Sequence, residues 1–158
     1  MNNPTQKSTS AYILASWIAL AVGSAGFLIG LWNAELGIEE KGYYFTVLAF
    51  GLFAAVSVQK SVRDRLEGIP VSDLYYGICW FGIVLAVALL AIGLFNATKI
   101  DMGQKGFYAM AYVLCIFSAI TVQKNTRDQL QLSMAGEGVQ PQAPQYQAPI
   151  SHSSMKNH

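Results

Sequence analysis

The chain contains one sequence twice. The stretch KGYYFTVLAFGLFAAVSVQKSVRDRL begins at Lys41, and its counterpart KGFYAMAYVLCIFSAITVQKNTRDQL begins at Lys105, 64 positions later. Upstream, GLWNA from Gly30 matches GLFNA from Gly93 at an offset of 63. Internal repetition of this kind indicates that the 158 residues are built from two copies of one small structural unit.

Four long runs of the chain carry no charged residue and no histidine, two runs in each repeat: Tyr12–Leu31, Tyr43–Val58, Leu74–Phe95 and Phe107–Val122. As a helix, the 20 residues of the first run would cover about 30 Å, the thickness of a membrane's hydrocarbon core. The second and fourth runs have 16 residues each, but both begin with interfacial aromatics and end in Gln-Lys, whose lysine can reach the headgroups. We therefore expect an all-α integral membrane protein with four transmembrane helices, arranged as two tandem parallel helical hairpins.

Changes in composition divide the chain into five segments. We expect an N-terminal arm at 1–10, a first two-helix repeat at 11–66, a linker at 67–73, a second repeat at 74–130 and a tail at 131–158. The tail is rich in Gln, Pro and Ser, which is typical of disorder. Since the first apolar run aligns with the third, which lies in mid-chain, we interpret it as a retained span and not as a cleaved signal peptide.

The distribution of basic residues predicts the orientation. With four spans, the N-terminal arm, the linker and the tail share one side, which carries seven Lys and Arg residues, while the two short loops carry three. The positive-inside rule then places both termini in the cytoplasm. Because each repeat has an even number of spans, the two repeats point the same way and are related by an axis along the membrane normal.

The repeated segments resemble the YiaA/YiaB family of bacterial inner-membrane proteins, which is defined by a two-helix repeat. The resemblance rests on SWIALAVGSAGFLIGLWNAELGIEEKGYYF, GLFAAVSVQKSVRDRLEGIP and VQKNTRD, and covers residues 16–128. It implies a four-span bundle in the inner (plasma) membrane of a Gram-negative bacterium. It implies no catalytic residue.

Both repeats leave the membrane through the same motif, Q-K-x-x-R-D, and this motif supplies most of the candidate interaction residues: Gln59, Lys60, Arg63, Asp64, Gln123, Lys124, Arg127 and Asp128. One interpretation is a basic anchor that orients the helices. Orientation, however, requires only charge, and not four side chains in a fixed order. The second interpretation is a specific contact with a lipid headgroup or with another helix.

Asn33 and Asn96 follow equivalent Gly-Leu-aromatic triplets and are the remaining candidates. Asparagine at a helix end favours a left-handed C-cap. The alternative is a pair of amides that face each other near the outer surface and bind a polar ligand. Small residues also recur at four-residue spacing, as at Gly26 and Gly30 or at Gly51 and Ala55, which suits close helix packing within one chain or between copies.

The motifs of enzymes and of coupled transporters are missing from the sequence. No ionisable Asp, Glu, Lys, Arg or His lies within the four runs, and no phosphate loop, nucleophile elbow or metal-ligand spacing is present, so we expect no cofactor, no metal and no nucleic acid. The sequence favours a non-enzymatic structural, regulatory or adaptor protein whose partners are the lipid bilayer, a second copy or another membrane protein. The alternative is a small oligomeric channel or facilitator for an uncharged or small solute, lined by Ser16, Ser24, Thr46, Ser57, Ser118, Thr121 and tyrosines.

Overall fold

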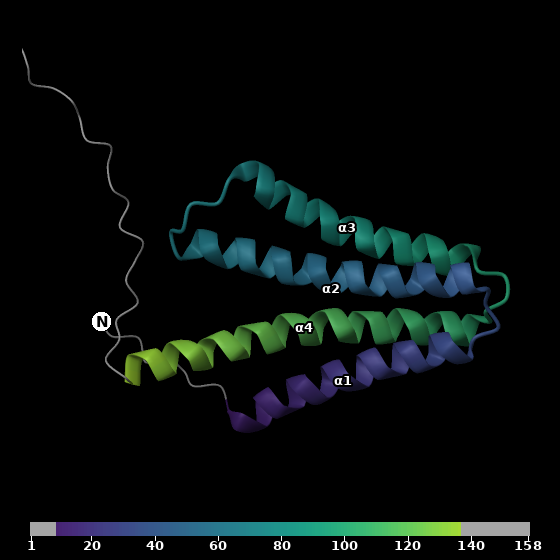
Figure 1. Ribbon diagram of the computed structural model, residues 1–158, viewed down its shortest axis with the longest axis horizontal. Coiled ribbons are helices and arrows are strands. Elements are labelled where there is room, and N and C mark those ends of the chain that lie inside the picture. Colours follow the sequence, from purple (N-terminus) through teal and green to yellow (C-terminus); the bar gives the residue numbers. More distant parts are fainter. Residues whose placement is uncertain (1–8, 137–158) are drawn as a thin grey trace, which may run out of the picture.

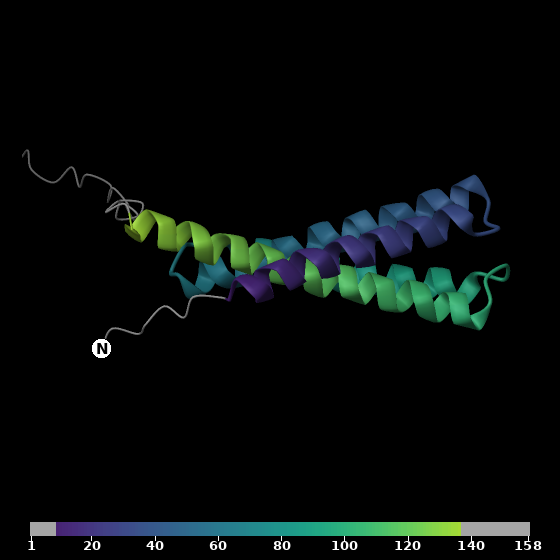
Figure 2. The same cartoon turned by 90° about the horizontal axis from the view of Figure 1, so that it is seen from below.

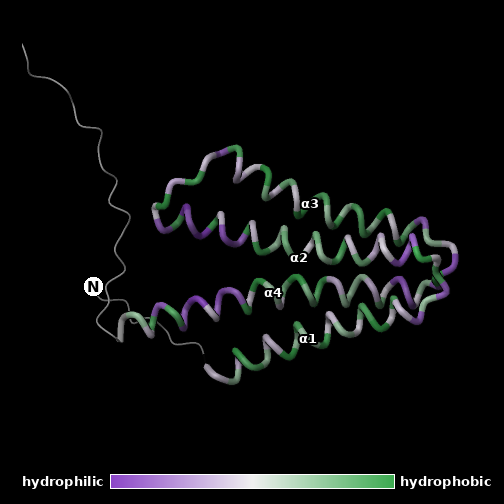
Figure 3. Tube along the Cα trace, in the orientation of Figure 1, coloured by the Kyte–Doolittle hydropathy of each residue, from purple (hydrophilic) through white to green (hydrophobic). Residues whose placement is uncertain are grey.

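A computed structural model describes residues 9–136, and within this part the chain forms four helices and no strand. The helices are α1 (Ser10–Asn33), α2 (Ile38–Leu66), α3 (Asp73–Asn96) and α4 (Met102–Gly136) (Figure 1). All four are long and apolar enough to cross a membrane. Hydrophobic residues fill the middle of each helix, whereas hydrophilic residues gather in the loops and where α2 and α4 leave the bundle (Figure 3). The all-α, four-helix membrane fold expected from the sequence is confirmed.

The helices pack across the repeats and not within them. Consecutive helices are antiparallel and joined by short connections, but α1 packs mainly on α4, α3 packs on α2, and α2 and α4 form the centre of the bundle. Viewed from below, α1 and α4 cross each other (Figure 2). The two helices of each repeat are therefore joined as a hairpin, but each packs mainly on a helix of the other repeat. The parallel tandem arrangement of the two hairpins in the membrane remains a prediction.

This exchange of packing partners between the repeats has an internal symmetry. The pair α1–α4 and the pair α3–α2 are equivalent combinations of one helix from each repeat, so a pseudo-twofold axis runs between α2 and α4. Equivalent positions are buried in both pairs: Asn125 of α4 donates a hydrogen bond to Ser16 of α1, 3.2 Å away, and Ser61 and Cys79, which occupy the same two positions in α2 and α3, are also buried. Each helix pair of the bundle is thus formed by one helix from each repeat.

Two boundaries differ in detail from the sequence prediction. Helix α4 continues to Gly136, because residues 131–136 contain helix-forming Gln, Leu, Met and Ala and no proline, so the first part of the expected tail is helical. Helix α3 begins at Asp73, the last residue assigned to the linker, and Ser72 accepts a hydrogen bond from the amide of Tyr75 as its N-cap. The remainder of the tail, 137–158, and residues 1–8 of the arm lie outside the described residues.

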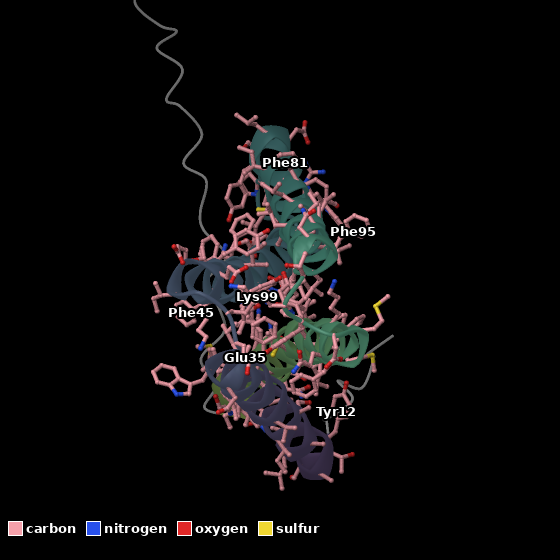
Figure 4. All side chains as sticks on the ribbon, turned by 90° about the vertical axis from the view of Figure 1, so that its right-hand side faces the viewer. Tyr12, Glu35, Phe45, Phe81, Phe95 and Lys99 are labelled. Carbon is pink, nitrogen blue, oxygen red and sulfur yellow. The ribbon has the colours of Figure 1, made fainter. Side chains whose placement is uncertain are left out.

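The outer surface of the bundle is apolar, as a lipid-facing surface must be. Large hydrophobic side chains on every helix are exposed, and Phe45, Phe81 and Phe95 point away from the bundle when it is viewed along its length (Figure 4). The charged side chains lie at the two ends. We call the end with the α1–α2 and α3–α4 loops the loop end, and the end where α2 and α4 leave the bundle the exit end.

Candidate functional site at the two ends of the bundle

An aromatic cluster closes the loop end. Tyr44 of α2 and Tyr108 of α4 occupy equivalent positions in the two repeats, and their rings stack with centroids 6.2 Å apart and planes 14° apart. Phe27 of α1 meets Tyr108 edge-on at 5.4 Å. All three side chains are buried. The Lys-Gly-aromatic-Tyr motif, which begins at Lys41 in one repeat and at Lys105 in the other, therefore contacts its own counterpart at the pseudo-twofold axis.

Glycines of the GL-aromatic-NA motif receive the neighbouring rings. A Cβ atom at Gly30 would lie 2.9 Å from Cε1 of Phe107, and one at Gly93 would lie 2.6 Å from Cε1 of Tyr43, both too close for a side chain. The Tyr43 hydroxyl also donates a 2.6 Å hydrogen bond to the carbonyl of Leu89 on α3. Both motifs are thereby explained by packing, since the glycine of one repeat accommodates the aromatic ring of the other.

Asn33 and Asn96 line two separate depressions at the loop end, of about 320 and 260 Å3. The two amides therefore do not share one surface, whereas the alternative of facing amides requires that they do. The left-handed cap is not seen either: each asparagine is the last residue of its helix, and the following Ala34 and Ala97 are extended, with φ of −67° and −68°. Asn33 instead donates a 2.9 Å hydrogen bond to the carbonyl of Ile29, one turn earlier.

Polar side chains beside these depressions cap the N-termini of the two long helices, α2 and α4. Glu40 accepts a 2.8 Å hydrogen bond from the amide of Gly37, and Gln104 accepts one of 3.2 Å from the amide of Asp101. These are equivalent capping interactions at the starts of α2 and α4. Lys99 lies 3.8 Å from Glu40. The loop end is thus occupied by interactions that hold the helices in place.

At the exit end, the two Q-K-x-x-R-D motifs come together through one carboxylate. Arg63 lies 3.7 Å from Glu67, and the equivalent Arg127 pairs with the other oxygen of the same Glu67. Glu67 has no acidic counterpart in the second repeat, where Gln131 occupies its position. The two motifs, 64 residues apart in the sequence, therefore form a single charged surface.

The two motifs differ in how their other charges are used. Lys60 forms a 2.6 Å ion pair with Asp64, whose side chain is only 10% exposed. Within residues 9–136, the equivalent Lys124 and Asp128 take part in no ion pair. The first motif is therefore internally neutralised, whereas the second presents a separate cation and a separate anion.

A groove opens beside this surface between α2, α3 and α4. It has a volume of about 560 Å3 and brings four of the candidate residues together at its polar part: Gln59, Arg63, Lys124 and Asp128. Gln59 Oε1 and two nitrogens of Arg63, Nε and Nη1, are inaccessible to solvent and have no hydrogen-bond partner in the described part of the chain. Gln123 Oε1 is in the same state but does not line the groove.

Three of the hydroxyl groups expected to line a channel are bonded within their own helices. Ser57 donates to the carbonyl of Phe53 and Thr121 to that of Phe117, each at 2.8 Å. Ser16 donates to the carbonyl of Tyr12 at the same distance. These contacts satisfy the hydroxyls locally, so they do not require water beside them.

The small-residue strips are used within the chain. A Cβ atom at Gly23 would lie 3.1 Å from the sulfur of Cys115, and one at Gly51 would lie 2.6 Å from Cζ of Tyr112. Ala55, Ala111 and Ala119 are buried. The sequence pattern indicated close packing but gave no sign of Tyr112 over Gly51 or of Glu67 between the arginines. In both cases the contact joins the end or the middle of α2 to α4 of the other repeat, so it depends on tertiary packing and not on a local pattern.

Comparison with known proteins relates the chain to a family of membrane proteins. A family model described as the yiaA/B two helix domain matches twice, at residues 12–64 and 75–128, and each match ends at the aspartate of an exit motif. The chain is 50% identical over 128 residues to "Inner membrane protein YiaA" of Escherichia coli (strain K12), which covers 81% of this chain and 88% of that protein.

Two more distant relatives match shorter stretches. "Inner membrane protein YiaB" of Escherichia coli (strain K12) is 28% identical over 103 residues, which covers 63% of this chain and 84% of that protein. "Uncharacterized membrane protein YubF" of Bacillus subtilis (strain 168) is 35% identical over 68 residues, or 42% of this chain and 78% of that protein. No solved structure matches the chain.

Proposed function

Because the chain belongs to the yiaA/B two-helix-domain family, we propose that it is a multi-pass inner-membrane protein that acts without catalysis, as a structural or adaptor protein. Its working surface is the exit end, which lies on the cytoplasmic side. The observation that carries this proposal is the meeting of the two exit motifs, since Arg63 and Arg127 both reach Glu67.

Charge and location support the cytoplasmic placement. The exit end carries the larger share of Lys and Arg, and the relatives in Escherichia coli are named inner membrane proteins. Basic side chains at the ends of α2 and α4 suit the negatively charged surface of the cytoplasmic leaflet. These side chains can therefore contact the lipid headgroups in the arrangement that the bundle already has.

The side-chain arrangement also favours an adaptor over a channel. The aromatic stack of Tyr44 and Tyr108 fills the loop end of the central α2–α4 pair, and the hydroxyls of Ser57 and Thr121 bond to their own helices. Flux of ions, water or glycerol through proteoliposomes above that of protein-free vesicles would support the channel and contradict the proposal.

Orientation is tested by labelling two exposed positions with a membrane-impermeant thiol reagent. In a Cys79→Ser/Cys115→Ser background, Leu66→Cys reports on the exit end and Ile38→Cys on the loop end, and both side chains are exposed. We expect Ile38→Cys to react once the outer membrane is opened, and Leu66→Cys to react only after the inner membrane is broken. The opposite order would contradict the cytoplasmic placement.

The adaptor role is tested by photocrosslinking in membranes. A photoreactive residue in place of Leu130 samples the exit end, and one in place of Ile38 provides the loop-end control. We expect a discrete protein adduct at position 130 alone, which weakens in an Arg63→Lys/Arg127→Lys variant because lysine cannot reproduce the two-pronged geometry of arginine. Equal adducts at both positions, or an adduct that ignores the arginines, would count against a specific exit-end surface.

A further inference from the structure

The groove at the exit end has apolar walls and a charged rim. Helix α3 packs on α2 and barely touches α4, and α2 lies between them (Figure 1). The groove is lined by residues of all three helices. Val58 of α2, Trp80 and Ile83 of α3, and Ile120 of α4 provide apolar walls. Apolar walls suit a hydrocarbon chain, whereas an ion or a sugar would not require them.

The length of the groove matches one leaflet of a bilayer. Its lining on α2 runs from Ala55 to Leu66, which corresponds to about 16 Å along the helix axis. One leaflet provides half of the hydrocarbon thickness of about 30 Å. The polar residues of the groove are found toward the exit end, where the headgroups would be, and the apolar walls continue toward the middle of the bundle.

Three charged side chains line the polar part of the groove. Arg63 lines the groove with its Nε 3.7 Å from Glu67, and Lys124 has no ion pair within residues 9–136. Both suit a phosphate group. Asp128, which has no ion pair in the same part of the chain, is an acceptor suited to an ammonium group.

We propose that the groove binds one phosphatidylethanolamine molecule of the cytoplasmic leaflet. Its phosphate lies between Arg63 and Lys124, its ammonium group faces Asp128, and an acyl chain lies over Trp80 and Ile120. The assignment to the cytoplasmic leaflet rests on the orientation proposed above. An anionic phospholipid without an amine would leave Asp128 unpaired, and free phosphate would leave the apolar walls uncovered.

The proposal is tested by quenching of Trp80 with brominated lipids. A Trp17→Phe/Trp32→Phe variant retains Trp80 as the single tryptophan, and a Trp32→Phe/Trp80→Phe variant retains the equivalent Trp17. The two indoles are similarly exposed, at 46% and 52%, so Trp17 reports on the bulk lipid composition. Each protein is reconstituted in phosphatidylcholine vesicles that contain a low fraction of chain-brominated phosphatidylethanolamine or phosphatidylglycerol.

We expect Trp80 to be quenched by phosphatidylethanolamine at about one third of the mole fraction that phosphatidylglycerol requires, a ratio typical of one exposed ion pair. Trp17 should follow the bulk fraction of either lipid. Asp128→Asn should abolish the preference, and Lys124→Gln should weaken quenching by both lipids. Lys60→Gln is the matched control, since Lys60 is paired with Asp64 and does not line the groove, and it should change neither.

Quenching of Trp80 that simply follows the bulk fraction of both lipids would overturn the site. A preference for phosphatidylglycerol, or a preference that survives Asp128→Asn, would overturn the headgroup assignment. Circular dichroism and gel filtration of each variant establish that it is folded. Lipid binding in vesicles does not depend on orientation or on a protein partner. A negative quenching result would therefore not affect the labelling and crosslinking tests of the proposed function.

Discussion

Tyr44 stacks on Tyr108 across the pseudo-twofold axis, with the ring centroids 6.2 Å apart. The two residues are copies of one another, so the contact is one that a single repeat could make only with a second copy of itself. It marks the point where α2 and α4 meet at the loop end. At the other end of the same pair, the exit motifs meet at Glu67. The central α2–α4 pair therefore connects the fold to the candidate site.

The contact between Gly51 and Tyr112 makes the α2–α4 interface sensitive to a single methyl group. A Cβ atom at Gly51 would lie 2.6 Å from Cζ of Tyr112 and closer still to its hydroxyl, and both residues are buried. We expect Gly51→Ala to lower the free energy of unfolding by about 1–3 kcal/mol through overpacking, as measured by denaturation in mixed micelles.

Gly77 provides the matched control for this substitution. It lies within α3, is exposed, and has open space where a Cβ atom would be. Gly77→Ala should leave stability unchanged or raise it by about 0.5–1 kcal/mol, since alanine favours helix more than glycine does. A similar loss of stability in both variants would show that the Gly51 contact is not specific.

The hydroxyl of Tyr112 is the second sensitive point of the interface. It is buried in the bundle and has no hydrogen-bond partner within residues 9–136. Since a buried polar group without a partner costs about 1–3 kcal/mol, Tyr112→Phe should raise the free energy of unfolding by about 1 kcal/mol and raise the thermal midpoint in detergent. The same substitution should partly rescue Gly51→Ala, because it removes the closest colliding atom. A lower midpoint for Tyr112→Phe alone would indicate that the hydroxyl has a partner.

The elements of the fold could be predicted from the sequence because they depend on local patterns. Charge-free runs define spans by length and composition, and the repeat makes the short spans credible through their partners. The pairing of the helices could not be predicted in this way. Whether α1 packs on α2 or on α4 depends on which glycine meets which ring, as at Gly30 and Phe107, and no periodicity records that choice.

Prediction of the candidate site was limited for the same reason. The order of residues in Q-K-x-x-R-D identified the exit motifs, but their convergence on Glu67 depends on a residue that breaks the repeat. The difference between Lys60 and Lys124 is likewise absent from the motif, since both stand four residues before an aspartate and, among residues 9–136, only the first is paired. For Asn33 and Asn96, the helix-end position was predicted and the backbone that follows it was not.

Exchanged packing predicts that the two repeats hold together without a covalent link. Separation of the chain between Pro70 and Val71 would place α1 and α2 on one fragment and α3 and α4 on the other. Because each outer helix packs on the other fragment, the co-expressed fragments should purify together in mild detergent through a tag on either one. Fragments that carry Gly51→Trp should associate less, since a large side chain would block the α2–α4 contact. Fragments that purify separately would contradict the exchanged arrangement.

The exchanged bundle brings the exit motifs together, and disulfide crosslinking in membranes tests it most directly. In a Cys79→Ser/Cys115→Ser chain with a protease site in the α2–α3 connection, one variant carries Ser16→Cys and Asn125→Cys, whose native side chains are 3.2 Å apart. A second carries Ser16→Cys and Ala55→Cys, which a packed α1–α2 hairpin would place opposite each other. After oxidation and cleavage, we predict that the first variant remains one covalently joined species until it is reduced, and that the second keeps its free thiols. Separation of the first variant into two fragments, together with loss of free thiols in the second, would contradict the exchanged bundle.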